Sequence, residues 1–140
     1  LGNMLGGRVL HLIDMAAAIA AIRHAGNPCV TASFDSVDFL TPIHVGEVVN
    51  LTARVTATFR TSMEVYVEVH AENMLTGNRR HTTTALTTFV AIDPATGQPT
   101  DVPPLLCETE AEQLMADGAA ARRAERRARI KQVSEQNERA

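Results

Sequence analysis

The chain has 140 residues, of which 45% are hydrophobic, and this length is typical of one domain. A formal net charge of −3 at pH 7 argues against a nucleic acid as the main partner. The longest apolar run, Met15 to Ile22, is too short to cross a bilayer, so we expect no membrane partner. Cys29 and Cys107 match no metal-ligand spacing, which favours a cytoplasmic protein with two reduced thiols.

The first 25 residues combine a glycine pair with a run that is predicted to form a helix. Gly6 and Gly7 stand where this helix is expected to begin, and the residues after them are apolar on nearly every side. Such a helix belongs in an interior. Asp14 lies in its middle, and a carboxylate in apolar surroundings is costly unless it is hydrogen-bonded, paired or hydrated. Asp14 therefore has a structural partner or faces a cleft.

The start of this helix has the parts of a hydrolytic site. A helix N-terminus presents unpaired backbone N–H groups, and glycine lets another group approach them closely. A developing oxyanion requires such donors. Asn3 lies just ahead, with an amide that donates or accepts hydrogen bonds. Asn3, Gly7 and Asp14 are the candidate catalytic residues, although the glycine pair taken alone also fits a flexible loop.

Four strands are predicted after the helix. Residues 30–40 form a strand whose apolar side chains change face near Asp35, which indicates a bulge. Alternating apolar and polar residues predict strands over 47–59 and 63–72, and a threonine-rich strand follows over 79–92. One buried helix followed by antiparallel strands is an α+β layout, in which the dry face of the sheet wraps around the helix.

From residue 105 the composition changes to Ala, Arg and Glu, and the balance of charge becomes neutral. Residues 105–140 are predicted to form a charged, helical C-terminal extension with little to bury, separate from a domain of residues 1–104. Its arginine cluster is interrupted by Glu125, and no aromatic residue is present to stack on bases. We interpret the extension as a solvated helix rather than an element that contacts RNA or the phosphates of CoA.

Four motifs, in order and at these spacings, resemble the acyl-CoA thioesterases of the hotdog fold. The resemblance is strongest to the YciA-like bacterial branch and to the animal cytosolic acyl-CoA hydrolases, and it covers residues 1 to about 104. The motifs are Asn3-x-x-Gly6-Gly7 with Asp14, and the segments 30–49, 60–69 and 87–93. The resemblance implies an antiparallel sheet wrapped around one long central helix, with a first strand ahead of Leu1.

The resemblance also implies an activity and an assembly. The expected reaction is hydrolysis of a fatty or short-chain acyl-CoA thioester to free acid and CoA, without a cofactor, because CoA belongs to substrate and product. Gly7 polarises the carbonyl, and Asp14 acts as general base or as nucleophile. Asn3 and Asp14 of one site come from different subunits of a homodimer, and dimers associate further, commonly as trimers of dimers. No metal is expected, because no ligand cluster has the required spacing.

The candidate CoA-binding residues lie at the helix start and at strand ends. In related thioesterases the segment that corresponds to residues 60–63 approaches the pantetheine arm and the nucleotide end of CoA. Guanidinium groups match phosphate bidentately, although each arginine taken singly also fits a surface position. The predicted set is Gly6, Arg60, Thr61, Ser62, Met63, Arg79 and Arg80.

Two other functions stay open. One is a hotdog module that binds acyl-CoA as a signal without hydrolysing it. The other is a hotdog dehydratase that acts on an acyl carrier protein. His11 and Asp14 share a helix face, as a dehydratase dyad would, but the position of His11 is variable in the thioesterases that the chain resembles. No Ser stands in a Gly-x-Ser-x-Gly motif, so the α/β-hydrolase route to thioesterase activity is absent.

Overall fold

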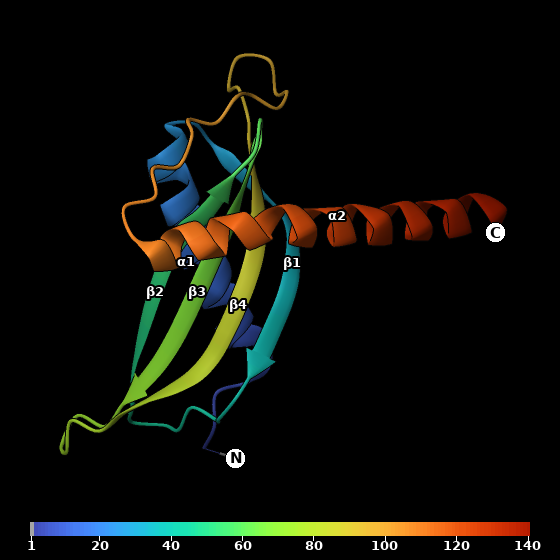
Figure 1. The fold of residues 1–140 in the computed structure, drawn as a ribbon. Coiled ribbons are helices and arrows are strands. Elements are labelled where there is room, and N and C mark those ends of the chain that lie inside the picture. Colours follow the sequence, from blue (N-terminus) through green and yellow to red (C-terminus); the bar gives the residue numbers. More distant parts are fainter. Residues whose placement is uncertain (1) are drawn as a thin grey trace. The chain divides into compact units, whose positions relative to one another are not determined.

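A computed structural model describes residues 2–140 of the chain. The chain forms two compact units, Leu1–Leu105 and Leu106–Ala140. The second unit contains the long helix α2 (Glu110–Arg139). The first unit contains, in chain order, α1 (Gly6–Ala25), β1 (Cys29–Phe39), β2 (Val48–Thr58), β3 (Ser62–Glu72) and β4 (Arg79–Ala91) (Figure 1).

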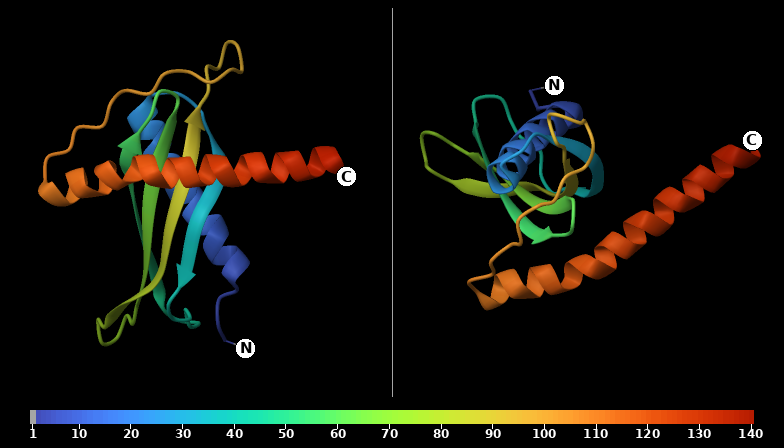
Figure 2. Two further views of the ribbon diagram at one scale, coloured as in Figure 1. Left: turned by 45° about the vertical axis from the view of Figure 1, so that its right-hand side comes forward. Right: turned by 90° about the horizontal axis from the view of Figure 1, so that it is seen from above.

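The four strands form one antiparallel sheet in the order β1-β4-β3-β2. The helix α1 lies against one face of this sheet and contacts all four strands (Figures 1 and 2). This arrangement is the hotdog fold, so the predicted α+β class and the predicted wrapping of a sheet around one helix are confirmed. Among residues 2–140, neither helix combines the length and the apolar character that a bilayer crossing requires.

The core lies between α1 and the two central strands. The helix buries every fourth residue, from Val9 through Ile13 to Ala25, because this spacing brings side chains back to one stripe. The stripe packs against the side chains of β3 and β4 that alternate onto the same face of the sheet. The fully buried members from these strands are Met63, Val65, Val67, Val69, Ala71, Ala85, Phe89 and Ala91.

Three large apolar side chains of α1 are left exposed within one chain. Met15, Ile19 and Ile22 are 50%, 51% and 43% exposed. In a single copy of the chain, the helix is therefore buried along one stripe only, and not on all sides as the sequence predicts. A contiguous apolar surface of this kind marks a contact site.

The predicted bulge in the first strand is confirmed. The pairing of β1 with β4 shifts register between Phe34 and Ser36, and a second shift lies between Thr31 and Ser33. Each extra residue reverses the face that the following side chains occupy. The strand therefore places Thr31 toward α1 at one end and packs Phe34 and further apolar side chains against the core.

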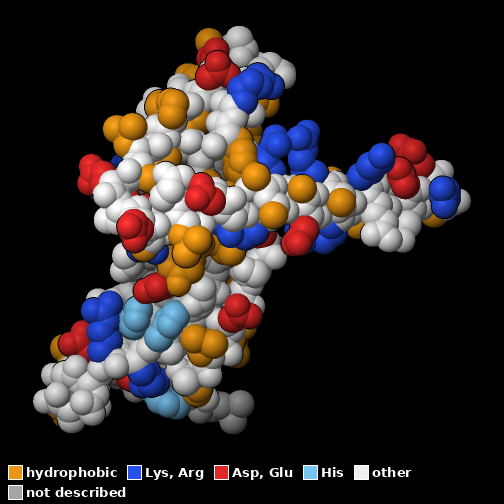
Figure 3. All heavy atoms as spheres, viewed as in Figure 1, with side chains coloured by type: hydrophobic (Ala, Val, Ile, Leu, Met, Phe, Trp, Pro, Cys, Tyr) orange, Lys and Arg blue, Asp and Glu red, His pale blue; other side chains and the backbone are white. Residues whose placement is uncertain are grey.

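The second unit begins with a well-defined helix cap. The Thr109 hydroxyl accepts a hydrogen bond from the Glu112 backbone N–H at 3.1 Å, and the Glu112 carboxylate accepts one from the Thr109 N–H at 3.3 Å. This reciprocal arrangement is a capping box, which satisfies two donors that a helix start otherwise leaves unpaired. Acidic and basic side chains both occur along α2 and are interspersed on the visible face of the molecule (Figure 3).

Candidate active site

Asp14 is half-buried on the flank of α1 and has a hydrogen-bond partner. The Thr31 hydroxyl on β1 donates to Asp14 Oδ1 at 2.6 Å. This hydrogen bond fixes the orientation of the carboxylate relative to β1. The sequence leaves open whether Asp14 has a structural partner or faces a cleft, and the structure supplies a partner at the exposed rim of the sheet. Thr31 carries no signal in the sequence that would identify it.

The helix α1 begins at Gly6, where the glycine pair predicts it. Its N-cap residue, Leu5, has an apolar side chain that offers no cap, and the Leu5 carbonyl accepts from the amides of Arg8 and Val9 at 3.0 and 3.3 Å. Within residues 2–140, the amides of Gly6 and Gly7 have no hydrogen-bond partner. A Cβ placed on Gly7 would meet no atom within 4 Å, so the space beside its Cα is open. This helix end can accept an anionic oxygen.

Gly7 and Asp14 belong to one helix but are far apart along it. Seven residues at a rise of 1.5 Å separate them by roughly 10 Å along the axis. A single bound thioester therefore cannot accept a hydrogen bond from the Gly7 amide and at the same time react with Asp14, or with a water held by Asp14, of the same helix. Within one chain, the predicted catalytic residues are therefore not brought together.

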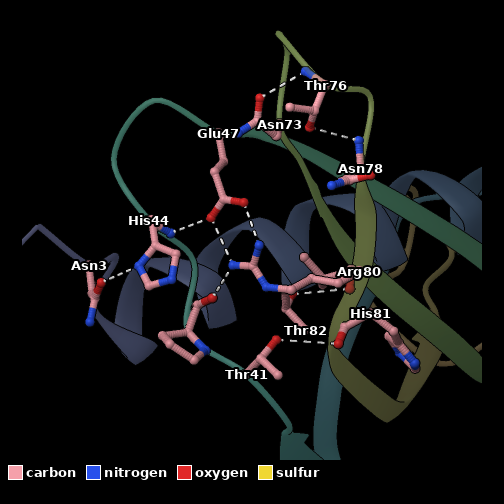
Figure 4. Close-up of polar contacts among 12 residues, drawn as sticks. Asn3, Thr41, His44, Glu47, Asn73, Thr76, Asn78, Arg80, His81 and Thr82 are labelled. Carbon is pink, nitrogen blue, oxygen red and sulfur yellow. Dashed lines mark hydrogen bonds and ion pairs between the residues drawn. The ribbon is translucent and has the colours of Figure 1, made fainter.

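Asn3 is fixed by His44, which follows β1 in the connection to β2. The two residues form an antiparallel bridge, flanked by hydrogen bonds from Met4 N to Ile43 O and from Val45 N to Gly2 O, each 2.8 Å long. Their side chains also meet, because His44 Nδ1 lies 2.7 Å from Asn3 Oδ1 (Figure 4). An amide oxygen only accepts hydrogen bonds, so the ring nitrogen donates and the amide nitrogen of Asn3 stays free to donate.

Two cavities flank the segment that leads into α1. One, of about 520 Å³, is lined by Asn3, Met4, Leu5, Arg8 and the residues 44–47. The other, of about 330 Å³, contains Gly6 together with the end of β1 and the connection after it. Asp14 lines neither of them. The site thus divides into a group at the start of α1 and a group around Asp14.

Arg80 and Glu47 form a bidentate ion pair next to this segment (Figure 4). One guanidinium nitrogen, Nη2, donates both to Glu47 Oε1 at 2.8 Å and to the Pro42 carbonyl at 2.6 Å. Glu47 Oε1 also accepts the His44 amide at 2.7 Å. The hydrogen bonds from Arg80 and then from His44 lower the pKa of Glu47 to about 2. The phosphate-binding candidate Arg80 therefore has a carboxylate partner within its own chain.

The other CoA-binding candidates lie at both ends of the sheet. Arg60 and Thr61 form the turn between β2 and β3. Ser62 and Met63 begin β3, and their side chains are buried. Met63 can therefore contact a ligand only through its backbone. The exposed Arg79 begins β4, beyond the opposite end of β3, and lines a cavity of about 500 Å³. An eleven-residue strand such as β3 is roughly 33 Å long, so one chain does not bring the two groups together.

The register of the sheet assigns Asp14 to one of these groups. Thr31 is paired with Phe89, and Phe89 is paired with Met63, so the Asp14–Thr31 pair lies toward the end of the sheet that carries Arg60. Gly6 lies toward the other end, where the cavity beside it includes Thr83. His44 and Glu47, which are not among the predicted site residues, are at that end too. The only signal for them in the sequence is their place around Gly46 in a turn.

The arrangement of potential metal ligands offers no metal centre in residues 2–140. No three side chains of His, Cys, Asp or Glu within this range are grouped so that they could share an ion. Two of the five histidines, His70 and His81, stack on each other with ring centroids 4.8 Å apart.

Comparison with known proteins identifies similar sequences and folds. The profile of the family described as the thioesterase superfamily matches residues 1–77. An uncharacterized acyl-CoA thioester hydrolase of Bacillus subtilis is 42% identical over 133 residues, which are 95% of this chain and 76% of that protein. A mouse acetyl-coenzyme A thioesterase is 36% identical over 87% of this chain, which spans 22% of the mouse protein.

Two solved structures are also similar. An apo hexameric acyl-CoA thioesterase is 47% identical, with a TM-score of 0.87 over 93% of this chain and 83% of the other. An acyl-CoA hydrolase of Staphylococcus aureus, in complex with butyryl-CoA, CoA and CoA disulfide, is 36% identical, with a TM-score of 0.88 over 98% of this chain and 83% of the other.

Structures of alanine variants of the S. aureus hydrolase allow a comparison of spacing. The aspartate and the threonine replaced in two of them are seventeen residues apart, as are Asp14 and Thr31. The asparagine replaced in a third stands fifteen residues before that aspartate, whereas Asn3 stands eleven residues before Asp14. The spacing therefore matches the Asp14–Thr31 pair and does not match Asn3.

Proposed function

This chain belongs to the thioesterase superfamily, and we propose that it hydrolyses acyl-CoA thioesters to free acid and CoA at a site shared by two subunits. It is an acyl-CoA thioester hydrolase with the hotdog fold, as its relatives and structural neighbours are. The observation that carries the proposed site is the Asp14–Thr31 hydrogen bond, at a spacing that recurs in a related hydrolase.

In the proposed mechanism, Asp14 acts on the thioester from one side. As a general base it takes a proton from water, whose oxygen then attacks the acyl carbon. As a nucleophile it attacks the acyl carbon itself and forms an anhydride, which water then cleaves. In both routes the carbon–sulfur bond breaks, the electron pair leaves with the CoA thiolate, and the thiolate takes up a proton. Thr31 holds the carboxylate in place.

The backbone amide of Gly7 stabilises the oxyanion that forms on the acyl oxygen. Its open surroundings and the absence of a partner within residues 2–140 support this role. Because roughly 10 Å separate it from Asp14 along the same helix, the amide and the carboxylate of one site come from two subunits. The exposed Met15, Ile19 and Ile22 supply the apolar surface on which a second α1 packs in the opposite direction.

Asn3 stays a candidate at the helix start, where it orients the water or the thioester. Its amide nitrogen is free to donate and points away from His44 (Figure 4). The spacing of Asn3 from Asp14 differs from that in the S. aureus hydrolase, which gives this assignment less support than that of Asp14. A variant at Asn3 therefore belongs in any test of the site.

CoA would extend between the two groups of candidate residues. Arg60, Thr61 and the backbone of Ser62 and Met63 lie toward the same end of the sheet as Asp14, and they contact the pantetheine arm. Arg79, which is exposed beside a cavity of about 500 Å³, contacts phosphate from the neighbouring subunit, and Gly6 allows close approach at the helix start. CoA enters as part of the substrate, and we propose that no metal or other cofactor is required.

The assembly and the domain limits complete the proposal. We infer a homodimer that associates into a trimer of dimers, supported by the hexameric state of the similar thioesterase structure. Residues 1–104 carry the activity, and residues 105–140 form an extension. We place the protein in the cytoplasm, where relatives described as cytosolic hydrolases act.

The experiment that tests the function is a turnover assay with a panel of acyl-CoAs from acetyl to palmitoyl. Release of free thiol by the wild-type protein, and its loss in an Asp14→Ala variant that stays folded, is the expected result. Tight binding of a non-hydrolysable acyl-CoA without turnover of any panel member would favour a binding module instead. Hydration of an enoyl thioester carried on acyl carrier protein would favour a dehydratase.

A further inference from the structure

We propose that Arg80, Glu47 and His44 form a positioning network that holds residues 2–5, and with them the start of α1, in the arrangement that hydrolysis requires. No member of this network touches the reacting atoms. The inference rests on the proposed function and adds to it three residues that act through others. It also gives Arg80 a role other than binding a phosphate of CoA.

The network is anchored on β4 by the ion pair of Arg80 with Glu47. Each guanidinium Nη atom contacts one carboxylate oxygen, and Nη2 also donates to the Pro42 carbonyl. The Arg80 side chain is 37% exposed and that of Glu47 only 10%. A bidentate pair with one partner mostly covered has a defined geometry, unlike a single contact between two mobile surface side chains. Arg80 thereby fixes the connection between β1 and β2 to the sheet.

Glu47 passes this constraint to His44 through a tight turn. The Glu47 carboxylate accepts the His44 amide at 2.7 Å, and the Glu47 amide donates to the His44 carbonyl at 3.2 Å. Gly46, inside the turn, has a φ of +92°, a conformation that favours glycine. The two hydrogen bonds close the turn on both sides, so the position of His44 follows that of Glu47.

His44 then holds the segment that leads into α1. Its ring donates to Asn3 Oδ1, and the backbone on either side forms two further hydrogen bonds, from Met4 to Ile43 and from Val45 to Gly2. Met4 lies two residues before Gly6, where the helix begins. A continuous chain of hydrogen bonds therefore joins β4 to Asn3, three residues before the helix begins (Figure 4).

This geometry argues against phosphate binding by Arg80. A phosphate would have to displace the Glu47 carboxylate and the Pro42 carbonyl, and it would leave a mostly covered carboxylate without its cation. Both arginines line the cavity of about 500 Å³, but Arg79 is exposed and makes no ion pair within residues 2–140, so it is the better phosphate ligand of the two. The two roles differ in kinetics, because a contact to bound CoA acts on KM and a positioning residue acts on kcat.

A double-mutant cycle tests the network. We expect Arg80→Gln and Glu47→Gln each to lower kcat by roughly tenfold to a hundredfold, since small displacements of catalytic groups are costly, while KM stays within about twofold. The double variant should be no slower than the slower single variant, because both changes break the same contact. A raised KM with normal kcat in Arg80→Gln, an unchanged kcat in either variant, or additive losses would overturn the proposal.

Hydrogen exchange provides a readout that does not depend on activity. The amides of Met4 and Val45 donate across the bridge, and we expect both to exchange faster in Glu47→Gln and in His44→Ala. His44→Asn, which keeps a nitrogen donor close to the place of Nδ1, should restore slow exchange. Unchanged exchange in Glu47→Gln and His44→Ala would overturn the network. If the wild-type protein hydrolyses no acyl-CoA, the proposed function is wrong, but the exchange rates of the two amides still test the network.

A matched control removes an ion pair elsewhere. Glu135→Gln breaks the exposed pair of Lys131 with Glu135 on α2, whose nitrogen–oxygen distance is 4.0 Å. It should leave kcat and the exchange of both amides unchanged. If Arg80→Gln fails to fold, Arg80→Lys keeps the charge without the bidentate fork, and a loss of kcat smaller than that of Glu47→Gln is expected. A normal kcat in Arg80→Lys together with a raised KM would again favour a phosphate contact.

Discussion

The Thr31 hydroxyl donates a hydrogen bond of 2.6 Å to Asp14 Oδ1 and thereby joins the bulged strand β1 to the middle of α1. The contact holds the Asp14 carboxylate at the rim of the sheet. Met15, the next residue in the sequence, has an exposed apolar side chain. A carboxylate that is held in this way fits the role that we propose for Asp14.

Replacing Asp14 by Ala should lower thioester turnover by about two orders of magnitude or more, because the base or nucleophile is lost. Asp14→Asn is the matched control, since its amide oxygen still accepts from Thr31 but has no charge. We expect both variants to be slow and to keep the wild-type circular dichroism and oligomer mass. Near-normal turnover in a folded Asp14→Ala protein would remove Asp14 from the mechanism.

Thr31→Val should lower kcat by about tenfold, because the isosteric side chain cannot donate to Asp14 and the carboxylate loses its orientation. Thr31→Ser keeps the hydroxyl and should retain most of the activity. Steady-state kinetics with the acyl-CoA that the wild type hydrolyses fastest would compare kcat of the two variants with that of the wild type. Equal activity of the Val and Ser variants would show that the hydrogen bond has no part in catalysis.

The shared site predicts complementation between inactive variants. If Asn3→Ala and Asp14→Ala are each inactive, mixing them with subunit exchange produces about half mixed dimers, each with one intact site. Roughly a quarter of wild-type activity should return. Mass spectrometry of labelled chains confirms the exchange. No recovery after confirmed exchange would mean that each site is built within one subunit, and full activity of Asn3→Ala alone would remove Asn3 from the site.

The ion pair of Glu47 predicts a dependence of stability on pH. Its pKa is lowered from 4.5 to about 2, so the folded state favours the ionised carboxylate. The stabilisation is fully present above pH 4.5, where the unfolded chain is ionised as well, and it is lost as pH falls through about 2. Denaturant unfolding of the wild type and of Glu47→Gln should differ most above about pH 5 and converge toward about pH 2. A difference that stays constant over this range would contradict the assignment.

Treatment with a chelator should leave turnover intact. Neither the spacing of the candidate ligands in the sequence nor their grouping in residues 2–140 suits a metal ion. The assay compares the dialysed, chelator-treated protein with the untreated one. Loss of activity that returns on addition of zinc or manganese would refute the metal-free mechanism.

Local patterns in the sequence determine a large part of this protein. The start of α1 at Gly6, the four strands and the bulge near Asp35 are all predicted, because helix caps, alternation and a change of phase act over a few neighbouring residues. The order of the motifs also identifies the family correctly. Asp14 is marked as a candidate by its position in an apolar helix, which the sequence alone reveals.

Only the tertiary structure decides which of these residues meet. Thr31 reaches Asp14 because of the register of a bulged strand. Arg80 reaches Glu47, 33 residues away, because the β2–β3 and β3–β4 hairpins bring the starts of β2 and β4 to the same end of the sheet. The structure also separates Arg60 from Arg80 by the length of β3, although both are predicted from the sequence to bind CoA. Periodicity reports which face a side chain occupies, whereas such contacts depend on the register between strands and on the paths of the turns, which a local repeat does not encode.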